Sequence, residues 1–200
     1  SQKQRWGEAH EVGHSIIPWH DEMMHGDHLR TLSLTCEQLL EAEANYAAGR
    51  LLFLQEAFTE RVLASALTFE RVKALSKDFG NTMTSTLWRV VESVDTPTFG
   101  LVSRHPKQLS MGNSEPPVRY FLRSRLFARQ FGNVSDGELF RAIRRFCFGN
   151  RGPIGSDEVR LTDANGIEHI FFLESFFNGH EALTLGVYRK LHAVAIAAGY

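Results

Sequence analysis

Near the start of the chain, two histidines and a glutamate have the spacing of a metal-hydrolase site. Residues 8–14 read EAHEVGH and contain His10-Glu11-x-x-His14. Two histidines four residues apart on a helix project from the same face and can bind one ion, for which zinc is the usual choice. Glu11 lies beside them, where it can serve as a general base toward metal-activated water without being a ligand. The pentapeptide alone is also compatible with two histidines that share a helix by chance.

A catalytic zinc needs a third protein ligand, and a second motif supplies a candidate. Residues 41–45 read EAEAN. Glu41 and Asn45 are four residues apart and share a helix face, so the carboxylate can bind the metal while the amide orients a ligand histidine. Glu43 points to roughly the opposite side, and we expect it to be a solvated helix residue.

Small residues predict that the helices carrying the two motifs approach each other closely. Gly13 lies inside the first motif, although a glycine costs a helix about 1 kcal/mol relative to alanine. Ala44 and Ala48 lie on the second helix around Asn45. A close crossing of the two helices would bring all three ligand candidates together.

Helical periodicity and breaker residues predict the elements of the first half. We expect a helix over 4–17, ended by Pro18, and a long helix from an N-cap at Thr35 to about residue 58. Shorter helices are expected over 62–79 and 84–94. The polar segment 18–35 between the first two helices is expected to be irregular.

The second half has a different pattern. Residues 118–131 indicate a strand, although their apolar spacing also admits a helix. Ser135-Asp-Gly-Glu138 has the form of a capping box that opens a helix. Turn signals at 163–166 and 178–179 separate aromatic and β-branched runs, which is typical of antiparallel hairpins. Residues 118–188 are therefore expected to form a small α+β domain.

The two motifs together resemble the ImmA/IrrE-like zinc metallopeptidases. The first block of that family is matched by Arg5, Trp6, Ala9, His10, Glu11, Gly13 and His14, and the second by Glu41, Glu43, Ala44, Asn45, Ala47, Leu51 and Leu52. The chain departs from the family at 53–55, where Met-Pro is usual. More weakly, 73–93 resembles the family's helix-turn-helix-like pair.

The resemblance implies an α+β fold in two parts. Residues 1–112 would form a zincin-like metallopeptidase domain that includes a helix-turn-helix-like segment at about 62–95. Residues 113–200 would form a small α+β domain with an antiparallel sheet, and some relatives carry a sensory or regulatory domain there. It also implies an endopeptidase with Zn²⁺ held by His10, His14 and Glu41, with Glu11 as catalytic base and Asn45 as support. The expected substrate is a protein, typically a helix-turn-helix repressor cut in a stress response.

Two other interpretations stay open: a metal-binding regulator without proteolytic activity, and a DNA-binding module. The DNA-binding interpretation rests on residues 76–94 and on the arginines of 118–151, but the first segment lacks a basic face and a solvated face explains the second better. The formal net charge of −1, from 22 basic and 23 acidic residues, gives no general attraction to nucleic acid.

Several other side chains are candidates for the same chemistry. His20, His25 and His28 follow the first motif, but a polar loop more often carries histidines with no metal role. Tyr46 and His105 are unplaced candidates for stabilising an oxyanion. Cys36 and Cys147 do not form a disulfide framework, and the first residues lack the apolar region of a signal peptide, so we expect a cytoplasmic protein with no membrane span.

Overall fold

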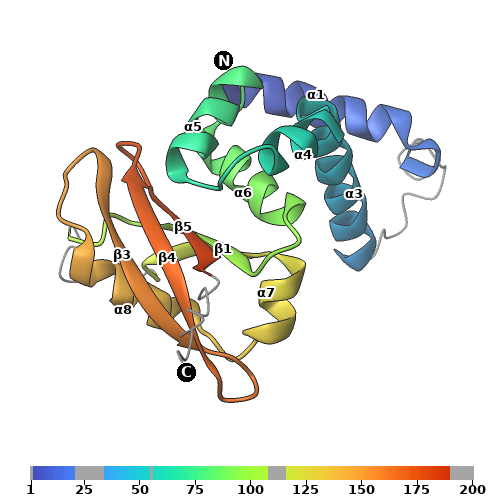
Figure 1. Cartoon of the computed structure of the whole chain (residues 1–200). Helices are drawn as coiled ribbons and strands as arrows, with labels where there is room; N and C mark the ends of the chain where they lie inside the picture. The colour runs from blue at the N-terminus through green and yellow to red at the C-terminus, as the bar shows by residue number, and fades with distance from the viewer. Residues whose placement is uncertain (1, 21–33, 55, 108–115, 190–200) are drawn as a thin grey trace, which may run out of the picture.

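The computed structural model describes residues 2–20, 34–54, 56–107 and 116–189. It confirms the α+β prediction: helices form the first part of the chain, and a five-stranded antiparallel sheet with two further helices forms the second. Figure 1 shows the helical part packed against one side of the sheet part. None of the helices in the described ranges is both long and apolar enough to cross a bilayer.

The two motif-bearing helices form largely as predicted. Helix α1 (Gln2–Ile16) ends before Pro18, and the backbone is helical again over 18–20. Helix α3 (Leu34–Leu52) begins one residue before Thr35, the residue expected to cap it. His25 and His28 lie outside the described residues.

The prediction of one helix running to about residue 58 is wrong. Leu54 has a positive φ of 50°, and a separate helix, α4 (Glu56–Leu63), follows. Tertiary contacts cause the break: Phe53 turns into the core, where its ring lies 4.7 Å from that of Phe58. The Leu52 carbonyl at the buried end of α3 has no partner within the helix and accepts a hydrogen bond from the side-chain amide of Asn81.

Two capped helices follow, α5 (Phe69–Asp78) and α6 (Met83–Ser93). The single helix expected over 62–79 is wrong, because Thr68 caps α5 separately from α4. The helix expected over 84–94 agrees with α6. The inner side of α6 is buried at Thr86, Leu87, Val90 and Val91. Helix α6 packs this side against β1, β2 and β5.

The sheet has the order β2-β1-β5-β4-β3. Its strands are β1 (Thr98–Ser103), β2 (Val118–Arg123), β3 (Gly152–Thr162), β4 (Glu168–Phe177) and β5 (Ala182–Arg189). Strand β1 was not predicted, and it pairs with both β2 and β5 although it precedes the predicted boundary at 112/113. The sheet therefore extends beyond the expected 118–188, while the domain boundary stays a prediction.

Helices α7 (Arg125–Gln130) and α8 (Asp136–Phe146) cover the other face of the sheet. Residues 118–131 thus contain both a strand and a helix, whereas the sequence favoured a strand over this range and left a helix as the alternative. The predicted helix start at Ser135 is confirmed, since the Ser135 hydroxyl accepts from the Glu138 backbone amide as an N-cap. Both predicted hairpin turns are confirmed, at 163–167 and 178–181.

The sheet separates two hydrophobic cores. One contains residues of α3 to α6 with Val102, Leu183 and Leu185, and the other contains α7 and α8 with Phe99, Leu101 and Phe171. Neighbouring residues of β1 contribute to opposite cores, which explains why the whole strand is buried. The α1–α3 pair joins this framework through core residues such as Ala9, Ala48 and Leu52. Arg5 adds a polar link, since its guanidinium donates to the Phe79 and Gly80 carbonyls between α5 and α6.

Candidate metal centre

The site is built where α1 crosses α3, and Gly13 sets the distance between the two backbones. A Cβ atom placed on Gly13 would lie 2.7 Å from the Ala44 carbonyl oxygen and 3.2 Å from the Ala44 Cα. Ala44 and Ala48 are completely buried in the crossing. The predicted close approach is therefore present, and it depends on residues without large side chains.

We expect Gly13→Ala to destabilise the protein by about 1–3 kcal/mol, because the added methyl group meets rigid backbone. Alanine also has a helix propensity about 1 kcal/mol better than that of glycine, which only partly offsets the steric cost. Gly7→Ala is the matched control: Gly7 lies on the same helix, and a Cβ atom placed on it would meet nothing within 4 Å, so we expect stability to be unchanged or raised. Urea unfolding of both variants measures the difference, and equal stabilities would contradict this account of the crossing.

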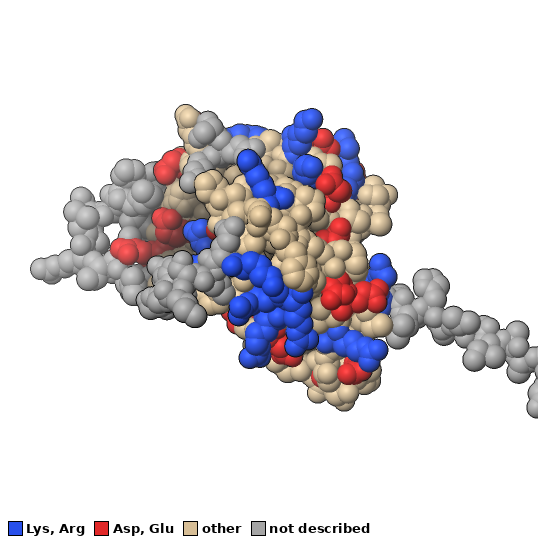
Figure 2. Space-filling view, turned by 90° about the vertical axis from the view of Figure 1, so that its left-hand side faces the viewer, with Lys and Arg blue, Asp and Glu red and all other residues tan. Residues whose placement is uncertain are grey.

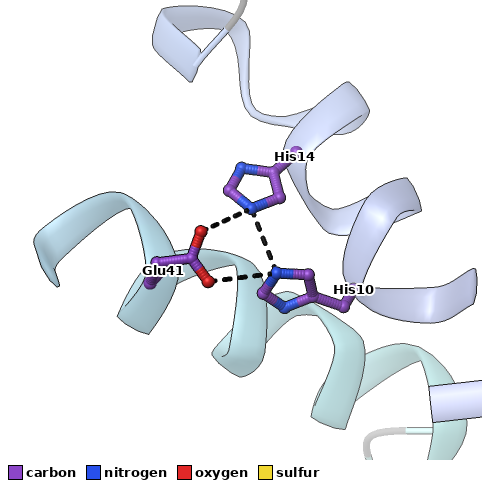
Figure 3. A group of neighbouring side chains, drawn as sticks. All are labelled: His10, His14 and Glu41. Atoms are coloured by element: carbon purple, nitrogen blue, oxygen red, sulfur yellow. Dashed lines mark hydrogen bonds and ion pairs between the residues drawn. The ribbon is translucent and has the colours of Figure 1, made fainter. Parts of the chain in front are cut away.

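The crossing brings His10, His14 and Glu41 together, as Figure 3 shows. The Nε2 atoms of the two histidines are 3.2 Å apart. Glu41 offers one carboxylate oxygen to each ring, at 3.2 Å from His10 Nε2 and 3.5 Å from His14 Nε2. The two imidazoles are mostly buried, while 60% of the Glu41 side chain is exposed, so the group opens toward solvent on one side.

The opposite side of the His10 ring contacts Asn45. His10 Nδ1 lies 3.2 Å from Asn45 Oδ1, and an amide oxygen can only accept, so Nδ1 carries the proton. In a neutral imidazole this leaves Nε2 with a lone pair directed at Glu41 and His14. Asn45 therefore lies where its predicted supporting role requires it.

The opposite side of the His14 ring is held by His20 and Glu43, neither of which the sequence predicted to support a ligand. His14 Nδ1 lies 2.9 Å from His20 Nδ1, and His20 Nε2 lies 2.9 Å from Glu43 Oε2. The indole of Trp19 donates to the same Glu43 oxygen at 2.7 Å. The expectation that Glu43 is merely solvated is therefore wrong, although Glu43 does point away from the three ligand candidates. These hydrogen bonds, from His20 first and then Trp19, hold the pKa of Glu43 below its ordinary value.

The hydrogen bonds behind the rings bear on the groups at the centre of the cluster: His10 Nε2, His14 Nε2 and the Glu41 carboxylate. Glu43 can only accept, so His20 Nε2 carries a proton; if His20 is neutral, its Nδ1 accepts and His14 Nδ1 donates. With His10 and His14 also neutral, their Nε2 lone pairs face each other and the Glu41 carboxylate, and a bound cation would remove the repulsion among these acceptors. The separations of 3.2 to 3.5 Å are close to the ligand–ligand edge of about 3.3 Å in a tetrahedral zinc site. The donor set thus fits zinc.

Glu11 lies on the open side of this group. Successive residues of a helix are about 100° apart around its axis, which places Glu11 on the side of the histidines opposite to Gly13 and α3. Its side chain is exposed, and among the described residues its carboxylate has no hydrogen-bond or ion-pair partner. It is therefore available to a molecule that approaches from solvent.

The oxyanion candidates are not brought to the group. His105 is buried in the sheet part, with its Nε2 at 2.9 Å from the Gly149 carbonyl. Tyr46 is exposed and accepts a hydrogen bond from Arg50. It lines an open, largely apolar groove of about 570 Å³ between the end of α1 and α3, which Trp19 and Glu43 also line.

The remaining candidates lie away from the crossing. Arg141, Arg144 and Arg145 are exposed on α8, and none of them forms an ion pair with a described residue. Figure 2 shows a gathering of basic side chains on the face turned toward the viewer, the side on which Figure 1 places α8 and β3. Cys147 is buried in the sheet core, and burial raises its pKa, which confirms core packing.

Comparison with known proteins adds little to this geometry. No family model matches the sequence, and no curated protein matches it. A solved structure described as a Mycobacterium tuberculosis transcriptional regulator is similar at 11% identity with a TM-score of 0.47, over 98% of this chain and 69% of that one. At this level the similarity carries no conclusion about fold or function.

Proposed function

We propose that the chain is a zinc-dependent endopeptidase of the ImmA/IrrE type. One observation carries the proposal: the Nε2 atoms of His10 and His14 and the carboxylate of Glu41 converge at 3.2 to 3.5 Å, while the Nδ1 atoms of the two histidines face Asn45 and His20. Three protein ligands with an open side distinguish a catalytic zinc site from a structural one, which is closed by four.

Each residue then has a role that follows from its place. His10, His14 and Glu41 would hold the ion, and Asn45 fixes the ring of His10. Zinc in such a site supplies Lewis acidity, which polarises a carbonyl and makes water more acidic. Glu11, on the open side, takes a proton from the attacking water and delivers it to the nitrogen of the leaving amine.

The substrate class is inferred from the sequence motifs. Their resemblance to ImmA/IrrE-like peptidases points to a protein substrate, typically a helix-turn-helix repressor whose cleavage starts a stress response in the cytoplasm.

Cleavage that depends on zinc tests the proposal. We expect the zinc-loaded chain to produce new peptide termini from a peptide library and from a panel of purified helix-turn-helix repressors, identified by mass spectrometry. The same chain stripped by a chelator should produce none, and added zinc should restore the cleavage.

Metal content, measured on the same samples, separates the outcomes. About one zinc per chain without any new termini would favour the metal-binding regulator. Tight binding to duplex DNA that weakens steeply with salt, with no metal bound, would favour the DNA-binding module instead.

A further inference from the structure

Glu43 and His20 form a hydrogen-bonded relay behind His14, and the proposed reaction leaves both residues without a role. We propose that they are positioning residues for the metal: the Glu43 carboxylate orients His20, and His20 in turn fixes the tautomer and orientation of His14. The proposal rests on the zinc site proposed above, and it concerns what sets the affinity of that site.

The directions of the hydrogen bonds support this role. Glu43 accepts from His20 Nε2; with His20 neutral, its Nδ1 is then the acceptor for the Nδ1 proton of His14, and the heavy atoms are 2.9 Å apart in both steps. The proton of His14 is thereby held on the side away from Glu41. The usual arrangement in zinc proteins is a carboxylate or carbonyl bound directly to the ligand histidine. Here one imidazole is inserted between the carboxylate and the ligand.

Burial restricts the His20 ring to its two hydrogen-bond partners. His20 is completely buried, and its two nitrogens contact only one carboxylate and one ligand imidazole among the described residues. The ring therefore has little freedom to swap partners. Trp19 anchors the carboxylate with a further hydrogen bond at 2.7 Å to the same oxygen.

The two ligand histidines are thus supported unequally. His10 is held by the neutral amide of Asn45, whereas His14 is connected through His20 to an anion. A carboxylate behind a ligand histidine makes the imidazole a stronger donor. The Glu43 carboxylate should therefore raise the zinc affinity through its charge, and not only through the packing of its side chain.

The test is the zinc dissociation constant of Glu43→Gln, measured by competition with a chromophoric chelator. The amide keeps the shape of the side chain and removes its charge, and we expect zinc to bind about 10- to 100-fold more weakly. Glu37→Gln is the matched control, because Glu37 is an exposed glutamate on the same helix with the same loss of charge; it should bind zinc like the wild type.

A spectroscopic signature separates positioning from folding. In the zinc-loaded wild type, proton NMR should show slowly exchanging downfield signals from His14 Nδ1–H and His20 Nε2–H. We expect Glu43→Gln to lose or shift both, whereas a variant that is only less stable would keep them while folded. His20→Gln, whose amide oxygen can still accept from His14, should bind zinc more tightly than His20→Phe.

Failure of this proposal differs from failure of the proposed function. If wild-type chain binds no zinc, the site and its relay both fall. If wild type and Glu43→Gln bind zinc equally well and show the same downfield protons, the relay alone is overturned and the zinc site stands.

Discussion

Glu11→Gln is expected to lower the rate of peptide cleavage by about 10²- to 10⁴-fold while the protein still binds about one zinc per chain. The magnitude is that of losing a general acid–base group. Glutamine has the size of glutamate, but its amide cannot take a proton from water in the transition state. Since Glu11 lies on the open side of the histidines and has no partner among the described residues, the change should leave the metal ligands undisturbed.

The measurement is kcat/KM on whichever peptide the library identifies, with zinc content determined on the same samples. Glu8→Gln is the control: it lies one turn earlier on the same helix and is hydrogen-bonded to Gln4, and it should cleave normally. Unchanged cleavage by Glu11→Gln would remove Glu11 from the reaction. A biological effect that persists without cleavage would point to the regulator.

The spacing of the motifs predicted the cluster of His10, His14 and Glu41 because spacing along a helix determines the direction of each side chain. His10 with His14, and Glu41 with Asn45, are each four residues apart on one helix, so their relative orientation needs no tertiary information. The crossing of the helices was predictable as well, because Gly13 is otherwise unfavourable in a helix interior.

The relay behind His14 was not predictable by the same reasoning. His20 follows Pro18, where the periodicity of α1 stops, so nothing local indicates where its ring lies. Glu43 does point away from Glu41, as the helical geometry requires, but its partners Trp19 and His20 come from a different helix. A buried histidine after a helix-ending proline is a signal only once the neighbouring helix is in place.

Errors in the fold have a similar origin. Strand β1 is covered on both faces, so its sequence TFGLVS lacks the polar–apolar alternation of a half-exposed strand. The break after Leu52 follows from the turning of Phe53 into the core and from the Asn81 contact with the Leu52 carbonyl. Both depend on residues distant in sequence, which local patterns do not contain.

His14→Ala is expected to weaken zinc binding by about 10²- to 10⁴-fold, because an even share of about 10–16 kcal/mol among three ligands is roughly 3–5 kcal/mol. The substitution removes one of the three proposed metal ligands and also leaves His20 Nδ1 without its hydrogen-bond partner. Elemental analysis should find about one zinc per wild-type chain and almost none in the variant after dialysis. Zinc should likewise raise the Tm of the wild type, since a ligand of the native state stabilises it, and leave that of the variant unchanged.

His180→Ala controls for loss of a histidine as such, because His180 is exposed in the turn between β4 and β5. It should bind zinc like the wild type. If His14→Ala kept its zinc, the ion would be held elsewhere, and the convergence of lone pairs at the crossing of α1 and α3 would need another explanation. We expect His14→Ala and Glu41→Gln both to lose zinc and Glu43→Gln to bind it with intermediate affinity. The largest losses would then come from the proposed ligands, and a smaller loss from a residue that acts on a ligand through hydrogen bonds.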